Sequence, residues 1–381
     1  MAPESSSRIP GIWSGVAWAL DRRVGSRGSR LRLGVRAVRA ALWHGKAMRR
    51  WMAMVFELRS RGIVSDLPGE YLRAIRPYVH GGIGMSTRVV QLIDHADWLE
   101  TALKPAAFER ITSGQPLIVA TLPPPRGCEY MRLQLQRSPP QSPEGDLMLT
   151  LVLQRSADVQ QKAAPVEAAT LAFSRFRIDG QSCFVIGGVR GQRHPVLRLS
   201  PTELAQALSG WKPPVLMVRV AQELAHFWGL RLVGLDPQAH PLRDWPYRWS
   251  RRNRETSDQI EKSYDAIWKH FDARRGDHGW MVLPLNSDDK LSAIALSPEK
   301  RARQTLRADY WIRTRNLLRT EFREQLRRPP AELQLTGATQ GFGPDTVLAP
   351  GARDDDADDT LGADDKRSPS RVLDTGPASL L

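Results

Sequence analysis

Seven residues near the middle of the chain combine the backbone freedom of glycine with the positive charge of arginine. They read Gly187-Gly-Val-Arg-Gly-Gln-Arg193, and they precede Ser200-Pro-Thr-Glu203, a sequence typical of a helix start. Amides at a helix start, beside arginine side chains, bind phosphate and other anions. The pattern therefore predicts a loop that cradles an anionic ligand, with a tight structural turn as the alternative. The cradle would be formed by Gly187, Gly188, Arg190, Gly191, Gln192 and Arg193.

Four other side chains have the chemistry to carry a proton. Glu223 and His226 are three positions apart, so they share one face of a predicted helix, where they could act as a base and its partner. His240 and Tyr264 are alternatives, with Tyr264 as a proton donor. Each of the four also has a structural interpretation. His95 follows the apolar face of a helical segment, and we interpret it as a core residue.

The sequence lacks the motifs of several enzyme classes. It has no His and Cys cluster with zinc spacing, no HExxH, no phosphate loop ending in Gly-Lys-Ser/Thr, and no GxSxG. These absences argue against metal catalysis and nucleotide hydrolysis, and we expect no metal site.

Strands are the elements that must position these groups. Five runs alternate or are rich in β-branched and aromatic residues, and their connections are too short for crossovers, which predicts a largely antiparallel sheet. Asp179-Gly180 is the expected hairpin turn between the last two. The five runs are 116–122, 128–135, 147–153, 170–178 and 181–186.

Helices are predicted on both sides of this sheet, which gives an α+β fold. Apolar residues recur at helical spacing before the strands, at 35–58, 68–76 and 86–103. After the strands come helices at 201–208, 215–228, 256–271 and 298–326, with short strands at 231–235 and 279–284. The predicted organisation is a flexible basic arm (1–34), a helical N-terminal part (35–112), an α+β core with C-terminal helices (113–328) and a disordered acidic tail (329–381).

The charge of the chain is unevenly distributed. The net charge is +14, but residues 331–381 carry ten acidic and four basic residues, so the rest of the chain carries +20. Such an excess favours an anionic partner, which could be an acidic lipid, an acyl donor, an acidic protein or, less well supported, nucleic acid. An arginine-rich composition that reflects only a GC-rich genome is the alternative.

Two basic segments contain aromatic residues. Trp13 and Trp18 beside the arginines of the arm suit an acidic membrane surface, although a solvated extension fits the weak pattern better. Segment 243–254 mixes Trp and Tyr with arginines, which would stack bases or pack against the body, and we favour packing.

Cysteine content and hydropathy indicate where in the cell the protein is located. Two cysteines, Cys128 and Cys183, are too few for a disulfide framework, and no run approaches the roughly 18 apolar residues of a membrane-spanning helix. We therefore expect a cytoplasmic protein without a transmembrane segment, with the inner face of the membrane as an alternative place.

Several motifs in the C-terminal half resemble the bacterial VirK/YbjX family. In order they are Ser263-Tyr-Asp-Ala-Ile-Trp268, Gly279-Trp-Met-Val-Leu-Pro284 and Ser297-Pro-Glu-Lys-Arg301, and the resemblance covers roughly residues 40–320. It extends to Arg76-Pro-Tyr78 and His95 earlier in the chain. The resemblance implies a role in envelope fitness, virulence-factor display or resistance to cationic peptides in Gram-negative bacteria, through a molecular activity that is not established. It is compatible with a basic binding protein.

The order of elements is also similar to that of the GNAT acyltransferases. A meander of antiparallel strands is followed by a glycine-rich loop, helices and a returning strand, which implies that coenzyme A or acyl-CoA binds at 187–193. An acyltransferase, a binding protein without chemistry and a nucleic-acid-associated stress protein are the functions that the sequence leaves open.

Overall fold

The structure is a computed structural model, which describes residues 12–21, 27–64, 66–124, 128–140, 142–155, 165–191, 201–243, 251–285 and 297–328. Contacts divide the chain into residues 1–348 and 349–381, and every described residue belongs to the first unit. The predicted acidic tail and most of segment 243–254 lie outside the described residues.

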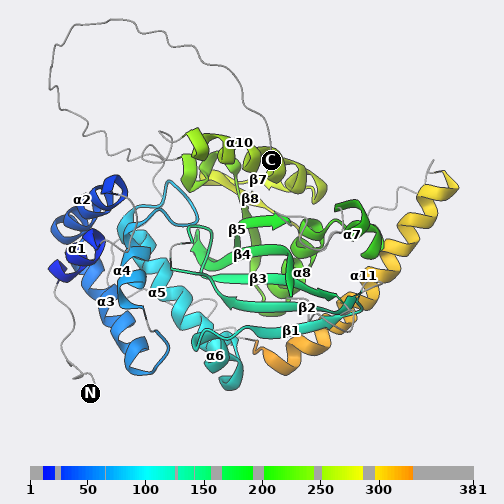
Figure 1. The fold of residues 1–381 in the computed structure, drawn as a ribbon, viewed down its shortest axis with the longest axis horizontal. Coiled ribbons are helices and arrows are strands. Elements are labelled where there is room, and N and C mark those ends of the chain that lie inside the picture. The colour runs from blue at the N-terminus through cyan, green and yellow to red at the C-terminus, as the bar shows by residue number, and fades with distance from the viewer. Residues whose placement is uncertain are drawn as a thin grey trace, which may run out of the picture. The chain divides into compact units, whose positions relative to one another are not determined.

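The described strands form one sheet of eight, in the order β1-β2-β3-β4-β5-β6-β8-β7 (Figure 1). The first five are antiparallel neighbours, as the short connections predicted. Asp179 and Gly180, with φ of 50° and 75°, make the tight turn between β4 and β5. The first five strands are β1 (Leu117–Leu122), β2 (Cys128–Arg137), β3 (Leu147–Arg155), β4 (Val166–Ile178) and β5 (Gln181–Gly191).

The sixth strand differs from the first five because it pairs with its neighbour in parallel. The chain leaves β5, forms helices α7 (Pro201–Ala207) and α8 (Pro213–Trp228), and returns as β6 (Arg231–Leu235) parallel to β5. A crossover of this length is what a parallel pair requires. Two short antiparallel strands complete the sheet, β8 (Trp280–Val282) beside β6 and β7 (Arg274–Arg275) at the edge.

Both faces of the central strands are buried. Successive strand residues point to opposite faces, and Phe184 and Ile186 of β5 belong to one apolar core while Cys183 and Val185 belong to the other. Helices α8 and α11 (Pro298–Gln325) supply side chains to the first core (Figure 1). Gly229 ends α8 in the left-handed conformation, with a φ of 67°, as its place after the helix predicted.

The N-terminal helices build the second core. They are α1 (Ile12–Leu20), α2 (Arg27–Trp43), α3 (Gly45–Ser60), α4 (Leu67–Ile75) and α5 (Met85–Ala102), followed by α6 (Pro105–Thr112). Helix α5 packs against β4. Later in the chain, α10 (Arg251–His270) follows two short 3-10 turns at Pro237–Ala239 and Pro241–Arg243. It contributes Tyr264, Ile267 and Trp268 to the first core, and Phe271, the residue after the helix, belongs to the same core.

The described residues of the predicted basic arm include α1 and the start of α2, where Ala19 and Leu33 are buried and Trp18 packs edge-on against Tyr71. The structure corrects one prediction. The glycine-rich stretch is not a loop between Gly187 and Gly191, since these residues continue β5 and pair with β4. Gln192 and Arg193 lie outside the described residues.

Candidate functional site

A break in strand pairing defines the first part of the site. Residues 183–186 of β5 pair with residues 231–234 of β6, whereas β5 continues to Gly191 along β4. The register with β4 shifts at Gly187, which is the extra residue of a β-bulge. We call the residues around this break, Glu144, Gly187, Val189, Arg190, His240 and Tyr264, the splay site.

Beyond the residues of β5 that pair with β6, the Tyr264 side chain of α10 hydrogen-bonds to the free edge of β5. Its hydroxyl donates to the Gly187 carbonyl at 3.3 Å, and it accepts from the Val189 amide at 3.2 Å. Burial raises the pKa of Tyr264, so the hydroxyl keeps its proton at neutral pH. One turn further along α10, the indole of Trp268 donates to the Leu235 carbonyl at 3.0 Å and fixes the helix on β6.

His240 lies beside Tyr264 between the two 3-10 turns. The two rings are 6.3 Å apart, and the imidazole Nδ1 accepts from the Leu242 amide at 3.2 Å. The side chain is buried, and among the described residues no group hydrogen-bonds its Nε2 atom. Burial, aided by the charges of Arg190 and Arg243, lowers the pKa of His240 to about 4. The ring is therefore neutral at pH 7.

The close approach of Glu144 to β5 explains why glycine occupies positions 187 and 188 of the predicted cradle. A side chain at Gly187 would meet the Glu144 carbonyl, and one at Gly188 would meet its carboxylate. That carboxylate forms an ion pair with Arg190. Three of the predicted anion-binding residues, Gly187, Gly188 and Arg190, are thus covered or neutralised by Glu144.

Gly191, the last described residue of the predicted cradle, borders an open hollow. A groove of about 670 Å³ lies between the end of β5, α7, the start of α8 and α11. Gly191 and Pro214 both line the groove and lie against each other, since a Cβ added at Gly191 would be 3.3 Å from the proline Cγ. The lining contains apolar side chains from all three helices, including Leu204, Pro214 and Leu306. We call it the α8 groove.

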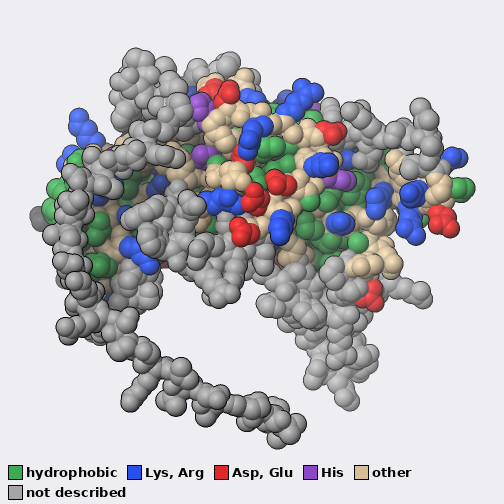
Figure 2. Space-filling model, turned by 90° about the horizontal axis from the view of Figure 1, so that it is seen from above, with side chains coloured by type: hydrophobic (Ala, Val, Ile, Leu, Met, Phe, Trp, Pro, Cys, Tyr) green, Lys and Arg blue, Asp and Glu red, His purple; other side chains and the backbone are tan. Residues whose placement is uncertain are grey.

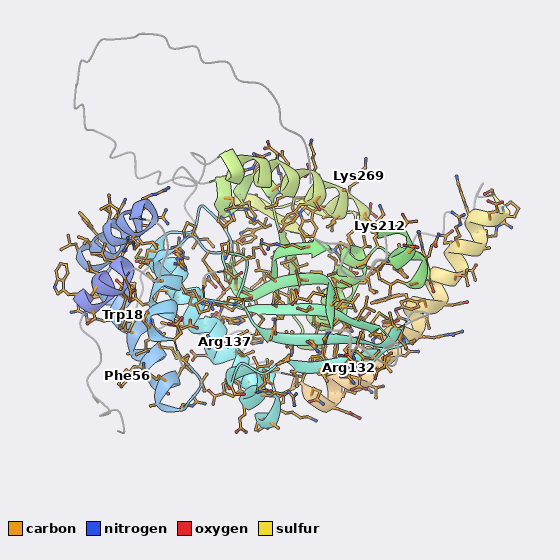
Figure 3. All side chains as sticks on the ribbon, in the orientation of Figure 1. Trp18, Phe56, Arg132, Arg137, Lys212 and Lys269 are labelled. Carbon is orange, nitrogen blue, oxygen red and sulfur yellow. The ribbon has the colours of Figure 1, made fainter. Side chains whose placement is uncertain are left out.

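Three cations and no acidic residue are found among the described residues that line the α8 groove. Lys212 precedes α8, beside α7 (Figure 3), and Arg303 and Arg307 lie one turn apart on α11. The Arg307 carbonyl accepts a hydrogen bond of 3.1 Å from the Trp211 indole, which ties α11 to the start of α8. Lys and Arg side chains also gather at the right of Figure 2, over α11. The groove suits an anionic ligand that has an apolar part.

The other predicted catalytic pair has a different environment. The carboxylate of Glu223 is buried on α8 and forms an ion pair of 2.8 Å with Arg319 of α11, while His226 is exposed in the last turn. Glu223 therefore joins two helices. Of the four predicted proton carriers, the structure brings His240 and Tyr264 together.

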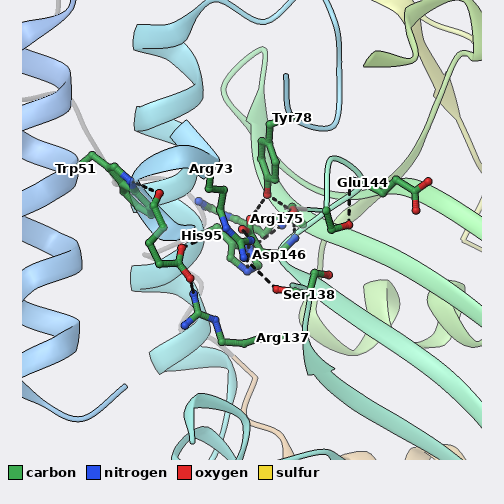
Figure 4. A network of polar contacts seen from close by, with 12 residues as sticks. Trp51, Arg73, Tyr78, His95, Arg137, Ser138, Glu144, Asp146 and Arg175 are labelled. Carbon is green, nitrogen blue, oxygen red and sulfur yellow. Dashed lines mark hydrogen bonds and ion pairs between the residues drawn. The ribbon is translucent and has the colours of Figure 1, made fainter. Parts of the chain in front are cut away.

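A buried polar network, which sequence reasoning did not predict, lies between the N-terminal helices and the sheet (Figure 4). The Asp146 carboxylate accepts from Arg73 of α4 at 2.5 Å, from the Tyr78 hydroxyl, and from Ser174 of β4 at 3.0 Å. Arg73 also donates to the Ser138 carbonyl at 3.0 Å and pairs with Glu70 at 3.2 Å. The available signal was Tyr78 in the motif Arg76-Pro-Tyr78; nothing in the sequence near Asp146 linked it to Arg73.

His95 of α5 belongs to this network as a neutral ring. Its Nδ1 atom accepts from the Arg175 amide at 3.0 Å, which leaves the proton on Nε2, 4.0 Å from an Asp146 oxygen. Burial lowers the pKa of His95 to about 4, against the attraction of Asp146. The expectation that His95 is a core residue fits this environment.

Asp146 remains ionised in spite of its burial. Burial by itself raises the pKa of the carboxyl, but His95, Arg73 and the hydroxyls of Tyr78 and Ser174 outweigh it and lower that pKa below its usual value. Because His95 is neutral at pH 7, Arg73 is the full charge opposite Asp146. The adjoining cavity, lined by His95, Arg137 and Asp146 among others, has a volume of about 40 Å³, room for a few water molecules at most. The network is a joint between layers and has no space for a substrate.

Within the described residues, no group of three or more His, Cys, Asp or Glu side chains is placed to hold a metal ion. No helix in the described part of the chain is long and apolar enough to cross a membrane.

Comparison with known proteins gives one match. Residues 27–308 match the model of a family described as "Protein of unknown function (DUF535)". No curated protein and no solved structure matches the chain.

Proposed function

The chain belongs to the DUF535 family of proteins of unknown function, and we propose that it is an acyltransferase whose acyl-CoA donor binds in the α8 groove. The observation that carries this proposal is the position of the cationic groove at the end of β5. Gly191 borders the groove, and Val189, two residues earlier on the strand, bonds to Tyr264. Two strand residues span about 7 Å, so the groove adjoins a buried proton donor.

The topology supports the proposal independently. An antiparallel meander, a helical crossover to a parallel strand, and a final pair of strands in the order β6-β8-β7 are consistent with the GNAT-like arrangement suggested by the order of elements in the sequence. The crossover between the two parallel strands contains both α7 and α8. The groove lies between these helices, and Lys212 directly precedes α8.

The lining of the groove fits the donor. A coenzyme A thioester supplies an activated acyl group on a long arm that ends in phosphates. Lys212, Arg303 and Arg307 would hold the phosphates, since Lys and Arg side chains form charge-assisted hydrogen bonds with phosphate oxygens. Leu204 and Leu306 would contact the apolar parts of the arm and acyl chain.

Two residues of the splay site would handle protons. Tyr264 holds a proton on its hydroxyl oxygen, because burial raises its pKa, and it is the group that would protonate a leaving sulfur. His240, neutral and with Nε2 unpartnered among the described residues, would accept a proton from the nucleophile. With the VirK/YbjX resemblance, we place the acceptor among components of the bacterial envelope.

Titration calorimetry with acetyl-CoA and a long-chain acyl-CoA tests the groove. In the variant Lys212→Gln/Arg303→Gln we expect the affinity to fall by about tenfold or more, since each phosphate contact removed costs roughly 1 kcal/mol. Arg313→Gln, an exposed arginine on α11 outside the groove, is the matched control. Absence of saturable binding, or an equal loss in the control, would contradict the proposal.

The variant Tyr264→Phe separates catalysis from binding. We expect unchanged acyl-CoA affinity, and release of free thiol from acyl-CoA, with an envelope lipid fraction as acceptor, that is slower by about 100-fold. Saturable binding without thiol release in the wild type would instead favour a binding protein that uses the same groove without chemistry.

A further inference from the structure

Exposed large apolar side chains are concentrated on the first two helices. Of the eight such residues in the described part of the chain, six belong to α1 and α2. They are Trp13 (62 % exposed), Leu20 (47 %), Leu31 (66 %), Val35 (61 %), Leu42 (60 %) and Trp43 (70 %). Single exposed apolar residues are ordinary, whereas a cluster of this kind indicates a contact surface.

Helix α2 is apolar on two opposite sides. At 100° per residue, Leu31, Val35 and Leu42 fall within one narrow stripe that faces outward. Leu33, Ala37 and Ala40 lie on the opposite side and are buried in the second core. The outer stripe is therefore additional to the face that folding requires.

Helix α1 extends this stripe. Trp13 and Leu20 are seven positions apart, which places them on one side of the helix. The Leu20 side chain lies against Gly34 of α2, where an added Cβ would be 2.7 Å from Leu20 Cδ2. Gly34 is one turn from Leu31, so the exposed apolar faces of the two helices adjoin. We call their six exposed residues the N-terminal apolar surface.

Positive charge surrounds this surface. Arg32 and Arg39 are exposed on the flank of the α2 stripe, and Lys46, Arg49 and Arg50 are exposed on α3. The first 50 residues contain eleven Lys or Arg and two acidic residues, a net charge of +9. Lys and Arg side chains lie beside apolar ones at the left of Figure 2, the region of α1 and α2 in Figure 1.

We propose that the N-terminal apolar surface docks the protein on a membrane that contains anionic phospholipid. Exposed apolar and tryptophan side chains on adjoining helices, bordered by cations, are the features by which helices lie in a bilayer interface. The charge decides between this occupant and a second copy of the chain, because the exposed cations beside the surface, Arg32, Arg39, Lys46, Arg49 and Arg50, would repel those of the second copy. This inference does not depend on the acyltransferase proposal.

Vesicle flotation of the full-length protein tests the docking surface. The probes are vesicles of phosphatidylcholine alone and of equal amounts of phosphatidylcholine and phosphatidylglycerol. We expect binding to the anionic vesicles that weakens as NaCl is raised, and a loss of affinity of about tenfold or more in Leu31→Ser/Val35→Ser/Leu42→Ser. Ile312→Ser, an exposed apolar residue on α11, is the control and should bind as the wild type does.

Circular dichroism and thermal unfolding show whether the triple variant is folded. We expect it to fold as the wild type does, since the three substituted side chains lie on the outside of α2. A folded triple variant with undiminished vesicle binding would overturn the proposal. So would a wild type that floats with neither kind of vesicle, or one that sediments as a dimer that the triple variant converts to a monomer.

Discussion

His95 lies among four charged groups, yet it is neutral at pH 7. Asp146 attracts a proton to the ring, while Arg73, Arg175 and Arg137 oppose protonation and burial opposes it most. The pKa is about 4 in the folded protein, against about 6.5 in an unfolded chain. The unfolded state therefore binds more protons between these values, so the contribution of His95 to stability is complete above about pH 6.5 and is lost as the pH falls towards 4.

The variant His95→Gln tests this linkage. For the wild type, His95 should account for a loss of about 2 kcal/mol in the free energy of unfolding between pH 7 and pH 5. In His95→Gln that part of the loss should vanish, while the similar contribution of His240 persists. Urea unfolding at the two pH values measures the difference, with exposed His226→Gln as the control. An unchanged pH dependence in His95→Gln would show that the pKa of His95 is the same in the folded and unfolded states, and would contradict the prediction.

At the residue scale, the types of the candidate functional residues could be recognised from the sequence, but which of them lie close together in space could not. His240 and Tyr264 were each selected by type, and their proximity follows from a 3-10 turn and α10 folding over the same part of β5. Asp146 was missed because its partners lie about 70 residues earlier, at Arg73 and Tyr78, and 28 later, at Ser174. No local pattern reports contacts over such separations.

Elements with strong periodicity or clear end signals could be predicted, such as α8 with Gly229 at its end and the strands from β1 to β4. The glycines at 187–191 were interpreted as a loop, because glycine is rare inside strands. Their reason is the close approach of Glu144 to β5, which is a tertiary contact. Strand β7 has two residues and exists through its pairing with β8, so it has no local signal either.

Gly234 of β6 is another glycine that a tertiary contact requires, as Glu144 does for Gly187 and Gly188 of β5. Its partners are Ile186 of β5 and Met281 of β8, and the Trp268 ring of α10 covers it. A Cβ at this position would lie 2.6 Å from the ring, so α10 must move away from β6. Because Tyr264 is one turn before Trp268, its hydroxyl would leave Val189.

We expect Gly234→Ala to lower the free energy of unfolding by about 1–3 kcal/mol, the usual cost of overpacking. It should also reduce protection of the Val189 amide in hydrogen exchange. Gly84→Ala is the matched control, since an added Cβ at Gly84 has open space and its φ of −62° suits alanine. Equal effects of the two substitutions would mean that α10 tolerates the added methyl group.

At the scale of the whole molecule, the Asp146 network connects two layers that are distant in sequence. Arg73, Tyr78 and His95 come from the helical N-terminal part, and Asp146 and Ser174 come from the sheet. Glu70 extends the connection, because its carboxylate accepts from Arg137 of β2 at 2.7 Å and its carbonyl accepts from the Trp51 indole at 2.9 Å. The second core lies on the same face of the sheet, so apolar packing and this joint act together.

Substituting Asp146→Asn removes one of the two carboxylates that pair with the buried Arg73 guanidinium and leaves it with Glu70 alone. Loss of one partner of a buried ion pair typically costs about 3–5 kcal/mol, and because Glu70 remains we expect a cost at the lower end of this range. The loss falls on the contact between the layers. In Asp146→Asn we therefore expect the backbone amides of α4 and α5 to lose protection from hydrogen exchange before those of β3 and β4. In the wild type the amides of all four elements should lose protection together. Asp265→Asn, at an exposed position of α10, should change neither stability nor the order of exchange. Uniform loss of protection in both layers of Asp146→Asn would mean that apolar packing alone couples them, and that the network supports the fold without joining its halves.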